Sequence, residues 1–228
     1  MSRVIFDIET AGFDFESLDS GIQEYLLKWV HTEDEVKAVK DSLSFYPNTA
    51  EVVAIGMLNP DTEKGAMYFQ APGGLIEPFE EDKISYYPGT ESDILSHFWE
   101  TIKKYDTFVT FNGRTFDCPF ILVRSAVCGV LPTRELLPNR YGGEHIDLMD
   151  RLNFFGASKR RFSLDVWCRT FGIKSPKSDG VTGYEVKDLF RSGEFEKIAR
   201  YCAGDLWATQ KLLFIWEKYI NTGSLSKR

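Results

Sequence analysis

Apolar and polar side chains alternate most clearly near the N-terminus, in residues 4–10 (VIFDIET). A period of two is typical of a β-strand, which sends successive side chains to opposite faces of a sheet. The apolar side chains Val4, Phe6 and Ile8 then share one face, and Asp7 and Glu9 share the other, about 7 Å apart. The pattern predicts a central strand with two carboxylates on one face.

The rest of the chain reads as strands interleaved with helices. Strands are predicted at 51–59, 66–70, 107–111 and 144–148, with a short edge strand at 83–87 after an irregular loop. Helical spacing predicts helices at about 90–104, 164–171, 185–191 and 195–219. A segment of about 15–44, with apolar residues at helical spacing around Tyr25 and Trp29, predicts one or two helices inserted after the first strand. Its acidic run 33–35 is read as a solvated helix start.

Two further acidic positions follow from these patterns. Residues 112–119 (NGRTFDCP) predict a turn into a helix, with Pro119 at the first helical position and Asp117 beside it. An Asp there is commonly a helix cap, which is compatible with a catalytic role. In the last helix Asp205 lies beside the apolar stripe, and Tyr201 lies one turn earlier on the same face. The predicted inward positions of that helix are Ile198, Cys202, Leu206, Thr209, Leu213 and Trp216.

Composition sets limits on the kind of protein. The 228 residues, 43% of them hydrophobic, suffice for one sizeable core, so we expect a single domain over 1–221 and a flexible tail at 222–228. No apolar run approaches a membrane span, and the predicted protein is soluble and cytoplasmic. The four cysteines are widely spaced, which favours reduced, packed thiols. The net charge of −7 argues against general binding to polyanions. The densest basic cluster is 158–161 (SKRR). Short basic runs are usually solvated surface, so we assign it to phosphate binding only if a phosphate-handling site lies nearby.

A pair of carboxylates on a central strand needs compensation. Burying an unpaired carboxylate is unfavourable, and a second one adjacent to it adds repulsion. A divalent metal ion between Asp7 and Glu9 resolves both costs. The alternative is a strand whose acidic end protrudes into water.

Three motifs in order carry a family resemblance. Asp7-x-Glu9, then Asn112-x-x-x-Phe116-Asp117-x-Pro119-Phe120, then Tyr201-x-x-x-Asp205 resemble the motifs of the DEDD superfamily of 3′-5′ exonucleases. The tyrosine four residues before the last Asp is typical of the DEDDy branch. The likeness is to the proofreading exonuclease domain of family B DNA polymerases and to stand-alone predicted exonucleases similar to it. It implies a ribonuclease H-like α/β fold, with a mixed central sheet of five or more strands flanked by helices.

Neighbouring families fit less well. The histidine branch of the superfamily has His five residues before the last Asp, where this chain has Arg200. Haloacid-dehalogenase-like phosphatases also begin with an acidic strand, but they require Asp-x-Asp, and Glu9 holds the second position.

The resemblance also implies roles for individual residues. Two ions, Mg²⁺ or Mn²⁺, would be held by Asp7, Glu9, Asp117 and Asp205, with Asp7 bridging both. Hard cations of this kind prefer oxygen ligands, which carboxylates supply. Tyr201 would orient the attacking water or help to deprotonate it. The candidates for substrate binding are Thr10, Asn112, Arg114, Phe116, Lys159, Arg160 and Arg161.

The predicted function is therefore metal-dependent 3′-5′ hydrolysis of single-stranded or frayed nucleic-acid ends, with DNA favoured over RNA. The competing hypothesis is a catalytically silent nucleic-acid-binding or scaffold module of the same fold. Such modules arise when carboxylates are lost, and all four carboxylates are present here.

Overall fold

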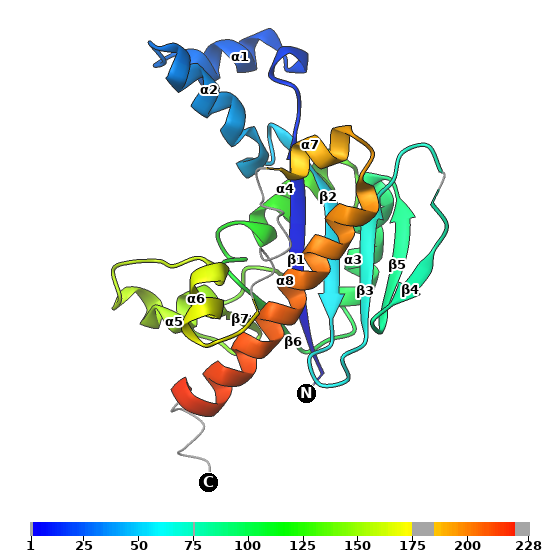
Figure 1. Ribbon diagram of the computed structural model, residues 1–228, viewed down its shortest axis with the longest axis vertical. Coiled ribbons are helices and arrows are strands. Elements are labelled where there is room, and N and C mark those ends of the chain that lie inside the picture. The colour runs from blue at the N-terminus through cyan, green and yellow to red at the C-terminus, as the bar shows by residue number, and fades with distance from the viewer. Residues whose placement is uncertain (1, 75, 175–184, 222–228) are drawn as a thin grey trace.

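A seven-stranded mixed sheet forms the centre of the computed structural model, which describes residues 2–74, 76–174 and 185–221 (Figure 1). The strand order is β4-β5-β3-β2-β1-β6-β7. The strands are β1 Arg3–Gly12, β2 Ala50–Leu58, β3 Gly65–Gln70, β4 Phe79–Glu81, β5 Ile84–Gly89, β6 Thr107–Thr110 and β7 His145–Asp147. The prediction of an α/β fold with a mixed sheet of five or more strands is confirmed.

Strand β1 lies inside the sheet, antiparallel to β2 and parallel to β6. The strands predicted at 51–59 and 66–70, with turn residues between them, would form a hairpin, and β2 and β3 do pair antiparallel. The segment predicted as an edge strand is β5, and that prediction is wrong in one respect, because β5 pairs with β3 on one side and β4 on the other. The edge strand β4 lies in the segment predicted as an irregular loop. Asp82 and Lys83, at φ 48° and 65°, make the tight turn between β4 and β5 without the glycine that would have signalled it.

Helices cover both faces of the sheet. They are α1 Ser20–Leu27, α2 Glu33–Ser42, α3 Glu91–Ile102, α4 Asp117–Val127, α5 Leu148–Leu152, α6 Leu164–Thr170, α7 Val186–Arg191 and α8 Phe195–Ile215. A π-helical turn, Trp216–Ile220, extends α8. The long helix α8 crosses one face of the sheet, and α3 and α4 pack on the other (Figure 1). The predicted inward positions of α8 are all buried.

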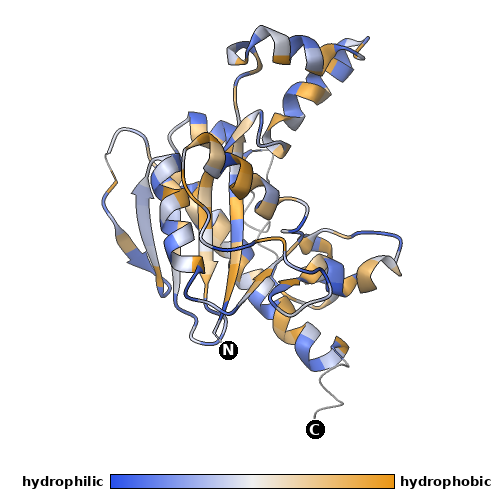
Figure 2. Cartoon of the chain, turned by 180° about the vertical axis from the view of Figure 1, so that it is seen from behind, coloured by the Kyte–Doolittle hydropathy of each residue, from blue (hydrophilic) through white to orange (hydrophobic). Residues whose placement is uncertain are grey.

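The two faces of β1 enter two different cores. Val4, Phe6 and Ile8 pack into the core under α3 and α4, whereas Ile5 packs into the core under α8. Hydrophobic residues accordingly dominate the central strands (Figure 2). Because side chains alternate along a strand, the acidic positions of β1 share the face of Ile5 and point toward α8.

Gly56 allows α8 to approach the sheet closely. It lies on β2 directly opposite Asp7 in the β1–β2 register. A Cβ atom at Gly56 would lie 2.7 Å from Leu206 Cδ1 and 3.1 Å from Cys202 Sγ, both on α8. A larger residue there would therefore push α8 away from the carboxylates of β1.

The predicted insertion after the first strand consists of two helices, α1 and α2, which project away from the sheet (Figure 1). Thr32 and Glu35 form a reciprocal capping box at the start of α2, so the acidic run is the helix start that the sequence predicts. The two aromatic residues around which the helical spacing was read are not core residues: Tyr25 is 76% exposed, and Trp29, which follows α1, is 78% exposed.

The tail predicted at 222–228 lies outside the described residues. So do Pro176, Asp179 and Gly180, for which the sequence predicts a polar loop between the helices at 164–171 and 185–191. The single-domain assignment stays a prediction. Among the described helices, none has the length and apolar character that a membrane crossing requires.

Candidate active site

The carboxylates of β1 meet α8 in the middle of the sheet. One ligand atom each from Asp7, Glu9 and Cys202 lie within 4.8 Å of one another. The negative charge of Asp205, three residues farther along α8, acts directly on Asp7. The motifs at the two ends of the chain are therefore brought together.

Asp117, the first residue of α4, also joins this group, and its charge acts on Asp7. It is 3% exposed, and its Oδ1 accepts a hydrogen bond from the main-chain N–H of Ile8 at 3.2 Å. Ile8 lies between Asp7 and Glu9 in the chain, so this bond attaches the start of α4 to the acidic stretch of β1. The structure thus brings all four predicted carboxylates together from three separate elements.

The local structure around Asp117 differs from the prediction in two respects. Phe116 occupies the cap position of α4, Asp117 is the first helical residue, and Pro119 is the third. Asp117 is not a cap, because its carboxylate is used by β1 instead. Helical spacing also predicts one apolar stripe of Phe116, Phe120, Val123 and Val127 on this helix. That prediction is partly wrong, since Val123 and Val127 are 38% and 64% exposed.

Burial is the largest electrostatic effect in this group, and mutual repulsion adds to it. Burial raises the pKa of Asp7 well above its usual value, and the charges of Asp117 and Asp205 raise it further. Burial likewise raises the pKa of Asp117 to about 7, against the lowering effect of the Ile8 N–H. A cluster of carboxylates with raised pKa values is typical of a site that is completed by positive charge.

Tyr201 lies one turn before Asp205 on α8, half-buried beside the carboxylates. Burial, followed by the charges of Asp205 and Glu9, raises the pKa of its phenol. Tyr201 therefore keeps its proton at neutral pH and presents a hydroxyl, not a phenolate, to the site.

Cys202 is a neighbour that sequence reasoning assigned only to the core. Its Sγ lies 3.7 Å from the main-chain oxygen of Asp7 and 3.8 Å from Asp7 Oδ2. Burial raises the pKa of this thiol well above its usual value, so it remains protonated and donates to Asp7. The oxygen donors beside this thiol are the carboxylates of Asp7 and Glu9, which are the ligand type that hard cations prefer.

The donor set therefore fits hard divalent cations. Carboxylate oxygens are the ligands that Mg²⁺ and Mn²⁺ prefer, and these ones are held together despite their repulsion. Asp7, Glu9, Asp117 and Asp205 are the residues that could hold such ions.

Three of the candidates for substrate binding are engaged within the protein. Thr10 is buried, and its Oγ1 donates to the main-chain oxygen of Ser44 at 2.7 Å. Phe116 packs against Phe120, with ring centroids 5.4 Å apart. The Arg114 guanidinium donates to the main-chain oxygen of Pro138 at 2.7 Å.

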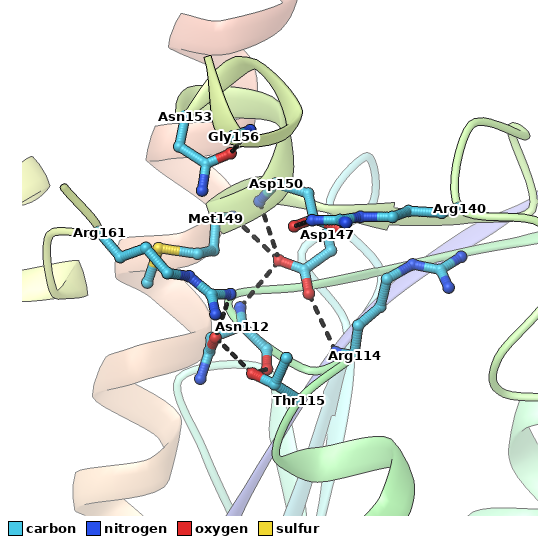
Figure 3. Close-up of polar contacts among 10 residues, drawn as sticks. All are labelled: Asn112, Arg114, Thr115, Arg140, Asp147, Met149, Asp150, Asn153, Gly156 and Arg161. Carbon is cyan, nitrogen blue, oxygen red and sulfur yellow. Dashed lines mark hydrogen bonds and ion pairs between the residues drawn. The ribbon is translucent and has the colours of Figure 1, made fainter. Parts of the chain in front are cut away.

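The basic loop lies next to the turn that precedes α4. Arg161 donates from its guanidinium to Asn112 Oδ1 at 2.9 Å (Figure 3). Arg160 stacks over Phe162 at 5.2 Å, and Lys159 is exposed. Within the described ranges none of the three cations forms a salt bridge, so their charge is available to a phosphate strand.

The last strand, β7, supplies two buried polar residues. The sequence favours a packed or surface histidine at position 145 over a ligand. In the structure His145 is packed: its Nε2 lies 2.8 Å from Thr110 Oγ1, and burial lowers its pKa to about 3. Asp147 was not predicted as part of any site. It is 2% exposed and contacts the turn at Asn112 and Arg114. Its place at the carboxyl end of a strand was the available signal.

Comparison with known proteins bears on this arrangement. A family model described as "Predicted 3′-5′ exonuclease related to the exonuclease domain of PolB" matches residues 76–227, more than half of the chain. The chain belongs to this family. The match contains Asp117, Tyr201 and Asp205, whereas Asp7 and Glu9 precede it. No curated protein sequence matches significantly.

A solved structure shares the fold of this family member. The family B DNA polymerase of the hyperthermophilic archaeon Pyrobaculum calidifontis aligns with a TM-score of 0.59 and 16% sequence identity. The alignment covers 96% of this chain and 24% of the polymerase chain, so the present chain spans about a quarter of that protein. At this identity the likeness concerns the fold, and the predicted ribonuclease H-like architecture is confirmed.

Proposed function

We propose that the chain is a metal-dependent 3′-5′ exonuclease of the DEDDy type, which removes nucleotides from single-stranded or frayed 3′ ends and prefers DNA. The observation that carries the proposal is the convergence of Asp7, Glu9, Asp117 and Asp205 with Tyr201. The family to which the chain belongs consists of predicted exonucleases of this direction.

Asp7, Glu9, Asp117 and Asp205 would hold the metal ions. Bound Mg²⁺ or Mn²⁺ supplies Lewis-acid polarisation of the scissile phosphate and makes water a better nucleophile. The protein fixes the donors by burial: β1 carries Asp7 and Glu9, α4 fixes Asp117 through the Ile8 N–H, and α8 carries Asp205.

Tyr201 would orient the attacking water through its hydroxyl. Its raised pKa argues against a role as general base. The phenolate that would accept a proton is scarce at neutral pH even for an unperturbed tyrosine, and Tyr201 holds its proton more firmly. Arg160, Arg161 and Lys159 would contact phosphates upstream of the terminal nucleotide, where their charge offsets the repulsion of the acidic protein.

The deciding assay uses a single-stranded oligonucleotide labelled at its 5′ end, in DNA and RNA form, with Mg²⁺ or Mn²⁺. A descending ladder of labelled products that disappears with chelator is expected, because hydrolysis begins at the 3′ end. Asp205→Asn serves as the inactive control. Early release of the labelled 5′ mononucleotide would contradict the proposal. Binding of the oligonucleotide without any hydrolysis would favour the silent binding module.

A further inference from the structure

Asp147 is a buried carboxylate that holds main-chain N–H groups from two separate segments. Its Oδ1 accepts from the N–H of Asn112 and of Met149, each at 2.9 Å, and its Oδ2 accepts from the N–H of Arg114 at 2.9 Å (Figure 3). The N–H of Asp150 approaches Oδ1 at 3.4 Å. The carboxylate thus caps α5 and at the same time braces the turn between β6 and α4.

The braced turn has a backbone conformation that needs support. Asn112 has φ +69°, in the left-handed region that costs a residue with a side chain free energy. Hydrogen bonds to the N–H groups on either side of Gly113 oppose relaxation of this conformation. Charge-assisted hydrogen bonds of this kind are the stronger class. Asp147 is therefore well placed to set the geometry of the turn.

The side chain of Asn112 transmits that geometry to the basic loop. Asn112 Oδ1 accepts from the Arg161 guanidinium at 2.9 Å and from Thr115 Oγ1 at 2.7 Å (Figure 3). A continuous chain of hydrogen bonds therefore runs from the buried Asp147, through the main chain and side chain of Asn112, to the exposed guanidinium of Arg161.

We propose that Asp147 is a positioning residue for substrate binding, which acts through Asn112 to hold Arg161 at the turn leading into α4, where the guanidinium would meet a phosphate of the single strand. The inference rests on the proposed exonuclease function and assigns a role to residues outside the acidic cluster. Asp117 has its own anchor in the Ile8 N–H, so loss of the brace at Asp147 leaves that carboxylate in place. The charge of Asp147 also raises the pKa of Asp117, so kcat is compared at saturating Mn²⁺ and alkaline pH, where Asp117 is ionised in both proteins.

The first test is Asp147→Asn, which places an amide N–H₂ where one carboxylate oxygen accepted a hydrogen bond. We expect KM for a single-stranded oligonucleotide to rise about tenfold, the effect of losing one charge-assisted contact, and kcat to stay within about twofold. The direction of the change in KM distinguishes lost positioning from a simple charge effect. Removing a negative charge should by itself favour a polyanion, so weaker binding points to lost positioning.

Asp150→Asn is the matched control. Asp150 is 3% exposed, is only three residues away, and is ion-paired with Arg140 without contacting the Asn112 turn (Figure 3). Its KM should equal that of the parent. An equal rise in KM for both variants would mean that any charge change near α5 disturbs the site, which would overturn the proposal.

A double-mutant cycle tests the route through Arg161. Arg161→Gln should raise KM, and adding Asp147→Asn to it should raise KM little further, because both variants lose the same contact. Additive effects would overturn the proposal. If Asp147→Asn does not fold, Asn112→Gly takes its place in the cycle, since glycine tolerates the positive φ while the side chain that holds Arg161 is lost.

A readout independent of catalysis separates this inference from the proposed function. Trypsin cleaves after the exposed cations at 159–161, and cleavage there should be several-fold faster in Asp147→Asn than in Asp150→Asn, because Arg161 is released. Faster cleavage in a protein that neither binds nor hydrolyses oligonucleotides would confirm the structural link and refute the exonuclease function. Unchanged cleavage together with an unchanged KM would refute the role of Asp147.

Discussion

Replacing Asp117 by Asn should stabilise the metal-free protein, although the residue belongs to the candidate active site. Asp117 is 3% exposed, and burial raises the pKa of its carboxyl group from 3.8 to about 7. The charges of Asp147 and Asp205 contribute to the same rise. Asn keeps a carbonyl oxygen for the Ile8 N–H but carries no charge, so the substitution removes the unfavourable interaction and keeps the favourable one.

The size and the sign of the effect of Asp117 on the free energy of unfolding follow from proton linkage. The pKa of Asp117 is raised from 3.8 to about 7, and each pKa unit is worth about 1.4 kcal/mol. Ionised Asp117 therefore lowers the free energy of unfolding by up to about 4 kcal/mol. Between pH 4 and pH 7 the folded protein binds more protons at this group than the unfolded chain does. Its contribution to stability is therefore greatest below pH 4 and is lost as the pH rises through about 7.

The assay is denaturant unfolding in the presence of chelator at several pH values between 4 and 8. The free energy of unfolding of Asp117→Asn should exceed that of the parent at pH 8, and the difference should shrink toward pH 4. Mn²⁺ should stabilise the parent more than the variant, because the ion binds the folded carboxylates. A variant that is less stable than the parent at pH 8 would refute the electrostatic reasoning.

Asp150→Asn provides a control of opposite sign. Asp150 is also buried, but it is ion-paired with Arg140, so loss of its charge leaves a guanidinium without its partner. Its substitution should lower the free energy of unfolding. Stabilisation by both variants would indicate a general response to reduced net charge.

Three further predictions concern neighbouring features. Neutralising the cations of 159–161 together should raise KM and flatten the salt dependence of activity without changing the melting temperature; a normal salt response would show that the loop is only solvated surface. Asp205→Asn should weaken Mn²⁺ binding in calorimetric titration and reduce activity by orders of magnitude, whereas Tyr201→Phe should lose activity but still bind Mn²⁺; full activity of Tyr201→Phe would refute its role. Gly56→Ala should cost about 1–3 kcal/mol in denaturant unfolding, because its Cβ would overlap α8, and unchanged stability would contradict that close packing.

The parts of the structure that the sequence predicted are those that side-chain periodicity encodes. The alternation in β1 placed Asp7 and Glu9 on one face, and the helical spacing of the last segment placed Asp205 beside a buried stripe. Burial on a sheet or helix requires such patterns, so a single sequence displays them. The convergence of the carboxylates was implied by the resemblance of the three motifs to a known superfamily, and the structure brings the four side chains together.

The parts that the sequence did not predict depend on the main chain. Asp147 binds only N–H groups, which every residue except proline supplies, so no partner side chain marks its role. The turn between β4 and β5 uses two residues with side chains at positive φ instead of the expected glycine. The exposure of Trp29 was equally hidden, because helical spacing shows which residues share a face but not whether another element covers it.

The charge distribution explains why the position of a single arginine can matter. The chain carries a net charge of −7, and its candidate site concentrates carboxylates, so the general field of the protein repels a polyanion. Bound cations would offset the charge only at the scissile end of the strand. Farther along the strand the attraction must come from side chains, and Arg161 is the member of the basic loop that is tied to the turn leading into α4. Fixing one guanidinium through buried main-chain bonds then gains affinity without the cost of ordering a free side chain at binding.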